Sequence, residues 1–178
     1  MTLTMNRIII AQGEHAFSDD PGVVFGAILG SCVATCVYDR ALNCGAMNHI
    51  LLPGGQASAE HDAERRYGAY LMEIMLNDMY KRGSRKRDLV FKVFGGASLF
   101  GATRGPGEKN VAFVRQFLEA EGFAIASESL AGTKGRRVEF TPTTGKAMMK
   151  FLQGSETIQP VERPLPRQPV CAGEVDLF

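Results

Sequence analysis

The sequence predicts a single-domain, layered α/β fold with a mostly antiparallel or mixed sheet and two main helices. Two stretches carry apolar residues at helical spacing, and most other segments are short apolar runs bounded by glycine, proline, asparagine or aspartate. Helices and sheets each bury an apolar face, so many strands with only two helices favour stacked layers around a shared interior. The 178 residues are enough for one such domain.

The strand segments follow one another along most of the chain. Residues 13–22, which contain Asp-Asp-Pro-Gly, are expected to form a loop, and residues 39–43 a turn. The expected strands are 7–12, 23–29, 32–38, 46–51, 89–94, 123–127, 137–141 and 146–152.

Two helices complete the predicted fold. The first spans 63–82, because apolar residues recur there every three or four positions, and Gly83 ends it. The second begins at Pro106, since proline is tolerated in the first helical turn, and stops at Gly122.

Composition and charge exclude several classes of protein. A net charge of +1 provides no overall attraction to nucleic acid or to an anionic membrane. The apolar run at residues 8–10 is too short for a signal peptide or a membrane span, so we expect a cytoplasmic protein with reduced cysteines and no membrane insertion. The domain is expected over 1–158, and four prolines predict a flexible C-terminal tail over 159–178.

Cys32 and His49 are the candidate catalytic residues. Cys32 follows a Gly-Ser turn at the start of a β-branched run, and His49 lies on the next expected strand, so a hairpin would bring thiol and imidazole together. The backbone N–H groups of Ser31 and Cys32 at the strand end are candidate oxyanion donors. A buried core cysteine and a strand histidine are the plain alternative.

A zinc site is a second alternative, because Cys32, Cys36, Cys44 and His49 include enough ligand types. On one extended strand, however, residues 32 and 36 lie about 13 Å apart, whereas two thiolates on one zinc ion lie within about 4 Å of each other. We therefore expect no metal and no cofactor, and small buried side chains at Cys36 and Cys44.

Several ordered segments are similar to those of the chemoreceptor glutamine deamidase family, CheD. The matching segments are 21–24 (Pro-Gly-Val-Val), 29–34 (Leu-Gly-Ser-Cys-Val-Ala), 45–53, 94–100 (Phe-Gly-Gly-Ala-Ser-Leu-Phe), 109–111 (Lys-Asn-Val) and 132–146. The resemblance extends from about Ile8 to Lys150, most of the chain.

The resemblance implies an α/β/β sandwich and a protein-glutamine glutaminase. It implies that the nucleophile Cys32 and the general base and acid His49 hydrolyse glutamine side-chain amides, and by the same steps glutamyl methyl esters, on the cytoplasmic helices of chemoreceptors. It also implies a CheC-type phosphatase as a partner in some members. A CheD-like module that binds receptors or the phosphatase without turnover is the alternative function.

The chain departs from the family pattern at Gly26. CheD-type proteins have a threonine six residues before the cysteine as a third member of the site. Because a carbonyl accepts a hydrogen bond from imidazole as well as a hydroxyl does, we expect the Gly26 backbone carbonyl to orient His49.

A basic run follows the first expected helix. It includes Arg82, Arg85, Lys86 and Arg87. Such runs are common at helix C-termini, and here the run is also a candidate docking patch for an acidic receptor helix. No aromatic residue interrupts it, so nucleic-acid binding is not expected.

Overall fold

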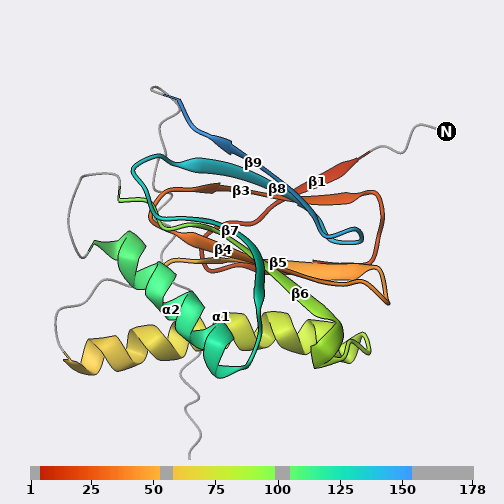
Figure 1. Ribbon diagram of the computed structural model, residues 1–178, viewed down its shortest axis with the longest axis horizontal. Helices are drawn as coiled ribbons and strands as arrows, with labels where there is room; N and C mark the ends of the chain where they lie inside the picture. Colours follow the sequence, from red (N-terminus) through yellow and green to blue (C-terminus); the bar gives the residue numbers. More distant parts are fainter. Residues whose placement is uncertain (1–4, 53–57, 99–104, 154–178) are drawn as a thin grey trace, which may run out of the picture.

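The computed structural model describes residues 5–52, 58–98 and 105–153 (Figure 1). The tail expected over 159–178, which includes Cys171, lies outside the described residues. Within the described part of the chain, no helix combines the length and apolar character needed to cross a membrane.

Nine strands in the described residues form two separate sheets. The four-stranded sheet has the order β1-β3-β8-β9, and the five-stranded sheet has the order β2-β5-β4-β6-β7. In chain order the strands are β1 (Asn6–Ile9), β2 (His15–Ser18), β3 (Val23–Leu29), β4 (Val33–Asp39), β5 (Cys44–Ile50), β6 (Leu89–Gly95), β7 (Ile125–Leu130), β8 (Arg136–Thr141) and β9 (Lys146–Phe151). Among these described strands, β1–β3 and β6–β7 pair in parallel and the others antiparallel, so both sheets are mixed.

Both helices cover the same face of the five-stranded sheet, and the four-stranded sheet covers its other face (Figure 1). These helices are α1 (Ser58–Lys81) and α2 (Pro106–Ala120). The result is an α/β/β arrangement with one apolar core under the helices and a second core between the sheets. The predicted layered α/β fold is thereby confirmed.

The alternation of β4 divides its side chains between the two cores. Val33 and Val37 face the helical core, whereas Ala34 and Cys36 face the core between the sheets. All seven residues of β5 are buried, because this interior strand is covered on both faces. Any functional side chain on these strands is therefore held by packing from two sides.

Several element boundaries differ from the predictions, most clearly at three elements. Residues His15–Ser18, expected in a loop, form β2, because pairing with β5 satisfies their backbone at a sheet edge. Helix α1 begins at Ser58 instead of residue 63. Strand β7 covers Ile125–Leu130 instead of 123–127, since its limits follow its parallel pairing with β6.

Candidate active site

Cys32 lies in the tight connection between β3 and β4, at the edge where the two sheets meet. Its side chain belongs to the core between the sheets, and the residue is only 4% exposed. The N–H of Gly96 donates to the Cys32 carbonyl at 2.7 Å, and the N–H of Ala97 donates to the Gly30 carbonyl at 2.8 Å. The segment after β6 therefore fixes the backbone of residues 30–32 by two hydrogen bonds.

Glycine is required in this supporting segment. Gly95 and Gly96 have φ values of +116° and +69°, a region that side chains with a Cβ rarely adopt. A Cβ on Gly95 would overlap the Cys32 carbonyl oxygen, and one on Gly96 would overlap the Val111 side chain. The two glycines allow the backbone at residues 95–96 to lie close to the backbone of Cys32.

Asn110 connects α2 to this turn. Its Oδ1 accepts from the N–H of Leu52 at 2.9 Å, and its Nδ2 donates to the Ser31 carbonyl at 2.8 Å. The side chain is fully buried, so these bonds form without competition from water. Asn110 thus joins the end of β5, the Ser31 turn and α2, a role that its place in the Lys-Asn-Val segment did not reveal.

His49 lies on β5, the antiparallel neighbour of β4. It pairs directly with Ala34, and Cys32 lies two residues before Ala34. Residues two apart on a strand share a face, so His49 and Cys32 are diagonal neighbours on the same face of the sheet, a separation of about 7–8 Å between Cα atoms. The predicted pairing of neighbouring strands is confirmed, and it places the thiol and the imidazole on one face of the sheet, although Nε2 makes no hydrogen bond to Sγ.

The imidazole of His49 is oriented by Ile10. Nδ1 lies 2.8 Å from the carbonyl oxygen of Ile10. A carbonyl can only accept, so Nδ1 carries the proton and Nε2 is left with a lone pair. Nε2 is one of four buried side-chain polar atoms in the described residues without a hydrogen-bond partner.

The expectation that Gly26 orients His49 was wrong in this respect. The Gly26 carbonyl instead accepts from the N–H of Ile10 at 2.8 Å. It therefore holds the residue that orients the imidazole and does not contact the imidazole itself. Phe25 and Ala27 face the core between the sheets, so Gly26 faces the opposite side of its strand. The orienting carbonyl thus comes from Ile10, the residue after β1, and not from the strand that precedes Cys32.

Burial shifts the pKa values of both residues toward their neutral forms. Removal from water raises the pKa of the Cys32 thiol to about 11, although a hydrogen bond from Gln12 and the backbone N–H of Cys32 act in the opposite direction. Burial lowers the pKa of His49, opposed by its bond to Ile10 and by the charge of Glu14. The free site at neutral pH is a neutral thiol beside a neutral imidazole, not a thiolate poised for reaction.

Gln12 is a contributor that the sequence did not reveal. Its Nε2 donates to the Cys32 Sγ at 3.2 Å. The residue follows β1 and is exposed, whereas the thiol that it covers is buried. No spacing pattern connects positions 12 and 32, because their contact depends on how the chain crosses between the two sheets.

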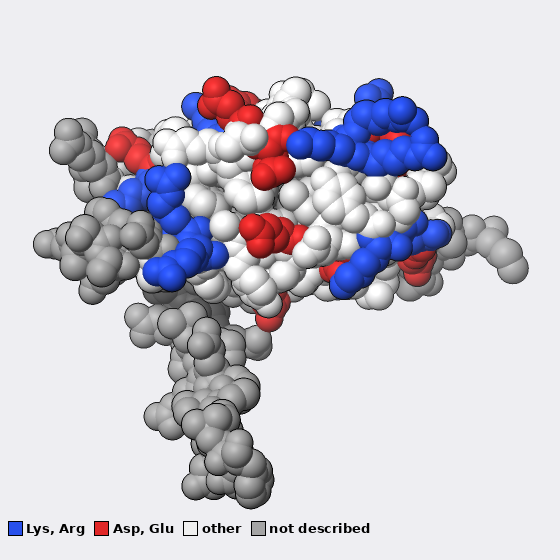
Figure 2. Space-filling view, turned by 90° about the horizontal axis from the view of Figure 1, so that it is seen from below, with Lys and Arg blue, Asp and Glu red and all other residues white. Residues whose placement is uncertain are grey.

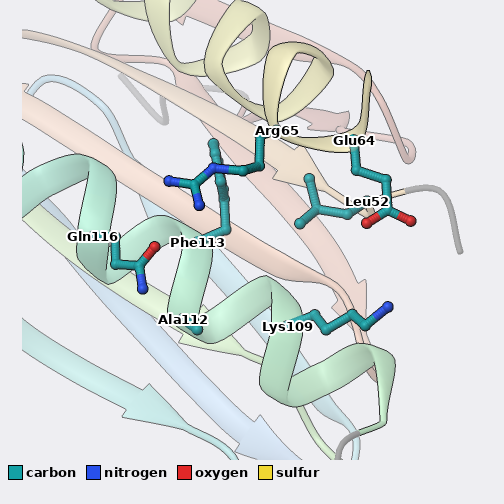
Figure 3. A pocket seen from close by; sticks show the side chains of 7 residues that line it. All are labelled: Leu52, Glu64, Arg65, Lys109, Ala112, Phe113 and Gln116. Carbon is teal, nitrogen blue, oxygen red and sulfur yellow. The ribbon is translucent and has the colours of Figure 1, made fainter. Parts of the chain in front are cut away.

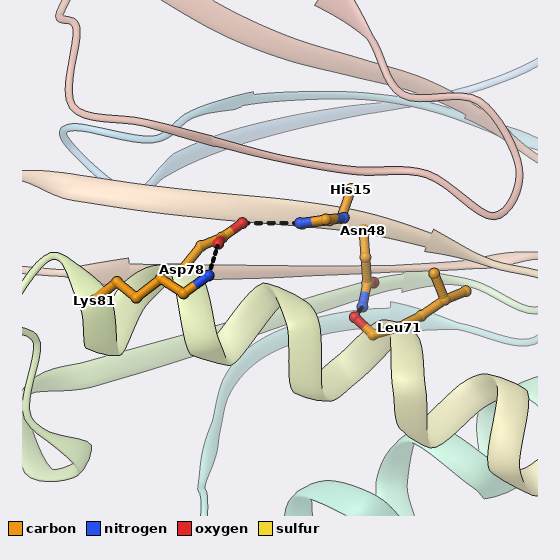
Figure 4. A network of polar contacts seen from close by, with 5 residues as sticks. All are labelled: His15, Asn48, Leu71, Asp78 and Lys81. Atoms are coloured by element: carbon orange, nitrogen blue, oxygen red, sulfur yellow. Dashed lines mark hydrogen bonds and ion pairs between the residues drawn. The ribbon is translucent and has the colours of Figure 1, made fainter. Parts of the chain in front are cut away.

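Among the residues whose side chains the structure describes, the other cysteines and His15 do not join this site. Cys36 lies in the core between the sheets, but Cys44 lies in the helical core, so the four residues considered for zinc are divided between opposite faces of the sheet. The Nε2 of His15 pairs with the Oδ2 of Asp78 on α1 at 2.8 Å (Figure 4).

The basic run lies at the far end of β4. The run ends just before Leu89, which pairs with Asp39 at the end of β4. Asp39 is seven residues after Cys32, a distance of about 23 Å along an extended strand. Arg82 pairs with Asp19 at 2.9 Å, and Lys86 lies 3.8 Å from Glu121. On the helical face, Figure 2 shows Lys and Arg side chains at both ends of the molecule with Asp and Glu between them.

A hollow of about 280 Å³ lies between α1 and α2 (Figure 3). Its lining residues are Leu52, Glu64, Arg65, Lys109, Ala112, Phe113 and Gln116. Leu52 and Phe113 belong to the helical core, whereas Cys32 belongs to the core between the sheets. The hollow is therefore on the opposite face of the five-stranded sheet from the thiol.

Comparison with known proteins gives a consistent family match. Residues 51–151 match the family model described as CheD chemotactic sensory transduction. The chain is 43% identical to a Caulobacter vibrioides protein, over 97% of this chain and 93% of the relative. It is 41% identical to one from Agrobacterium fabrum, over 100% and 99%, respectively. Both relatives are named "Probable chemoreceptor glutamine deamidase CheD".

The solved structures are more distant. The hypothetical protein YfiH of Bacillus licheniformis aligns with a TM-score of 0.43 and 15% identity, over 67% of this chain and 51% of that protein.

Proposed function

The chain belongs to the CheD family of chemotactic sensory transduction proteins, and we propose that it is a chemoreceptor glutamine deamidase with Cys32 as nucleophile and His49 as general base and acid. The observation that carries this proposal is the state of His49. Its Nδ1–H is fixed on the Ile10 carbonyl, and its Nε2 is buried and unpartnered among the described residues, on the same face as the Cys32 thiol. In this tautomer Nε2 carries the lone pair that a general base needs to accept the thiol proton.

The first half of the reaction forms a thioester. The Cys32 thiol proton moves to His49 Nε2 while Sγ bonds to the glutamine Cδ and the carbonyl electron pair moves onto oxygen. The electron pair on oxygen then reforms the carbonyl, and the C–N bond breaks. His49 gives its proton to the leaving nitrogen. Ammonia departs, and a glutamyl thioester remains on Cys32.

The second half releases glutamate. Water attacks the thioester carbonyl while Nε2 takes one of its protons, and collapse of the intermediate breaks the C–S bond. His49 returns that proton to the departing sulfur, and the glutamic acid loses its own to solvent. A glutamyl methyl ester would follow the same steps with methanol in place of ammonia.

The neutral resting pair suits a buried site. Separating a thiolate and an imidazolium there would cost more than keeping both neutral, as the raised pKa of Cys32 and the lowered pKa of His49 indicate. Proton transfer would then accompany attack, with charge developing on the substrate oxygen. Backbone N–H groups of Ser31 and Cys32 are the proposed donors to that oxygen.

The alternative function is a CheD-like module that binds chemoreceptors or a CheC-type phosphatase without turnover. The high thiol pKa favours it, because only a minute fraction of the thiol is ionised at neutral pH. A binding module, however, requires no particular tautomer at His49 and does not account for the buried, unpartnered Nε2. The two functions differ in whether ammonia is released.

The decisive experiment is mass spectrometry of receptor cytoplasmic fragments incubated with the protein. We expect a mass gain of about 1 Da at specific glutamines, since NH₂ is replaced by OH. Cys32→Ala should abolish the gain, and His49→Gln should reduce it at least a hundredfold. Cys36→Ala is the matched control, because Cys36 is a buried cysteine on the same face of β4 without a role in the reaction. Turnover that survives Cys32→Ala would contradict the mechanism.

A further inference from the structure

One side chain donates a hydrogen bond to the Cys32 thiol: the Nε2 of Gln12 lies 3.2 Å from Sγ. This bond and the backbone N–H of Cys32 itself both lower the pKa of the thiol against the effect of burial. Both groups therefore favour negative charge at this position. The pairing of a side-chain amide with the nucleophile's own N–H resembles the general construction of an oxyanion hole.

We propose that Gln12 is a catalytic residue whose carboxamide completes the oxyanion hole of the deamidase alongside the backbone N–H groups of Ser31 and Cys32. This proposal rests on the proposed function. When Sγ bonds to the substrate Cδ, the carbonyl oxygen lies one bond beyond the new S–C bond. A donor already at hydrogen-bond distance from Sγ reaches that oxygen by a small side-chain adjustment.

The backbone around Gln12 is fixed to His49 by three hydrogen bonds. The Ile10 carbonyl accepts from His49 Nδ1 at 2.8 Å, the Gly13 N–H donates to the His49 carbonyl at 2.8 Å, and the His49 N–H donates to the Glu14 carbonyl at 3.0 Å. Residues 10–14 are therefore held against His49 at three points. An oxyanion donor works by being positioned before the reaction, and this attachment provides the positioning.

The exposure of Gln12 also fits this role. Cys32 is 4% exposed, whereas Gln12 is exposed and covers the thiol from the solvent side. The Gln12 carboxamide therefore contacts the buried Sγ and is also accessible from solvent, where a receptor glutamine arrives. No other side-chain donor to Sγ is found in the described residues.

The experiment measures kcat and KM for ammonia release from a receptor cytoplasmic fragment. Gln12→Met keeps the length of the side chain without a donor, and Gln12→Glu keeps its shape but replaces the donor with a charged acceptor. We expect both to lower kcat about a hundredfold with KM changed less than about threefold, as for loss of one oxyanion donor. Gln116→Met, the same change on exposed α2, should keep the wild-type kcat.

A second measurement uses the free protein. Gln12→Met should slow alkylation of Cys32 by iodoacetamide at pH 8 severalfold, because the thiolate loses a donor. An unchanged kcat in Gln12→Met, with wild-type activity still dependent on Cys32, would overturn the role of Gln12 but leave the proposed function standing. A faster Gln12→Met would show that Gln12 obstructs the site, which also overturns the proposal. No turnover by the wild type would overturn both.

Discussion

The Ile10 carbonyl oxygen lies 2.8 Å from Nδ1 of His49, although the two residues are 39 positions apart in the chain. This bond sets the tautomer of the imidazole and leaves Nε2 free of partners within the described residues. It also connects the site to the neighbouring sheet, because the Ile10 N–H donates to the Gly26 carbonyl of β3. The geometry of the base therefore depends on the contact between the two sheets.

The reactivity of Cys32 should depend steeply on pH. Burial raises the pKa of its thiol from 9.0 to about 11, so we expect alkylation by iodoacetamide to accelerate about tenfold per pH unit from pH 7 to about pH 10. Peptide-resolved mass spectrometry measures the rate at Cys32 alone. Cys36, which is fully buried, should remain unmodified in the folded protein. A rate that levels off by pH 8 would contradict the raised pKa.

Burial of neutral His49 should reduce stability in acid. The pKa of His49 is lowered from 6.5 in the folded state, so below pH 6.5 the unfolded chain binds a proton that the folded protein excludes. The stabilisation is complete above pH 6.5 and is lost as the pH falls through the folded-state pKa, by up to about 1.4 kcal/mol per pH unit. Urea unfolding at pH 7 and pH 5 should show a smaller loss for His49→Gln than for the wild type. Equal losses would contradict this prediction.

Gly95→Ala should disrupt the site through the backbone. The residue has a φ of +116°, and a Cβ would overlap the Cys32 carbonyl oxygen, so we expect a loss of about 2 kcal/mol of unfolding free energy or more and a large loss of activity. Gly122→Ala is the control, since Gly122 has a φ of +70° with open space around its Cβ position. It should lose about 1 kcal/mol and retain its activity. Thermal unfolding and ammonia release measure the two effects.

Gly26→Thr should leave turnover nearly unchanged. Gly26 faces away from the core between the sheets, and a Cβ there would lie 3.1 Å from Cδ1 of Ile9, itself exposed and flexible. The new hydroxyl would not reach His49, so we expect less than a tenfold change in rate, which corresponds to about 1.4 kcal/mol. A hundredfold gain in ammonia release would show that a hydroxyl at this position limits the reaction.

The local part of the site was predictable from the sequence. Short apolar runs around a turn at residues 39–43 predicted neighbouring antiparallel strands, and β4 pairs with β5 as expected. The period of two along a strand then places Cys32 and His49 on one face. The positions of Ile10, Gln12 and Asn110 were not predictable in this way, because each reaches the site from an element distant in sequence.

The sequence by itself determined the layered α/β class, the two helices and the pairing of the strands that carry Cys32 and His49, because these depend on local periodicity and short connections. Only the tertiary structure decided which carbonyl orients His49, which side chain contacts the thiol, and that both groups rest neutral. These properties arise where the two sheets enclose the site and remove water from it. Desolvation and long-range contacts are sums over the whole fold, which no local pattern records.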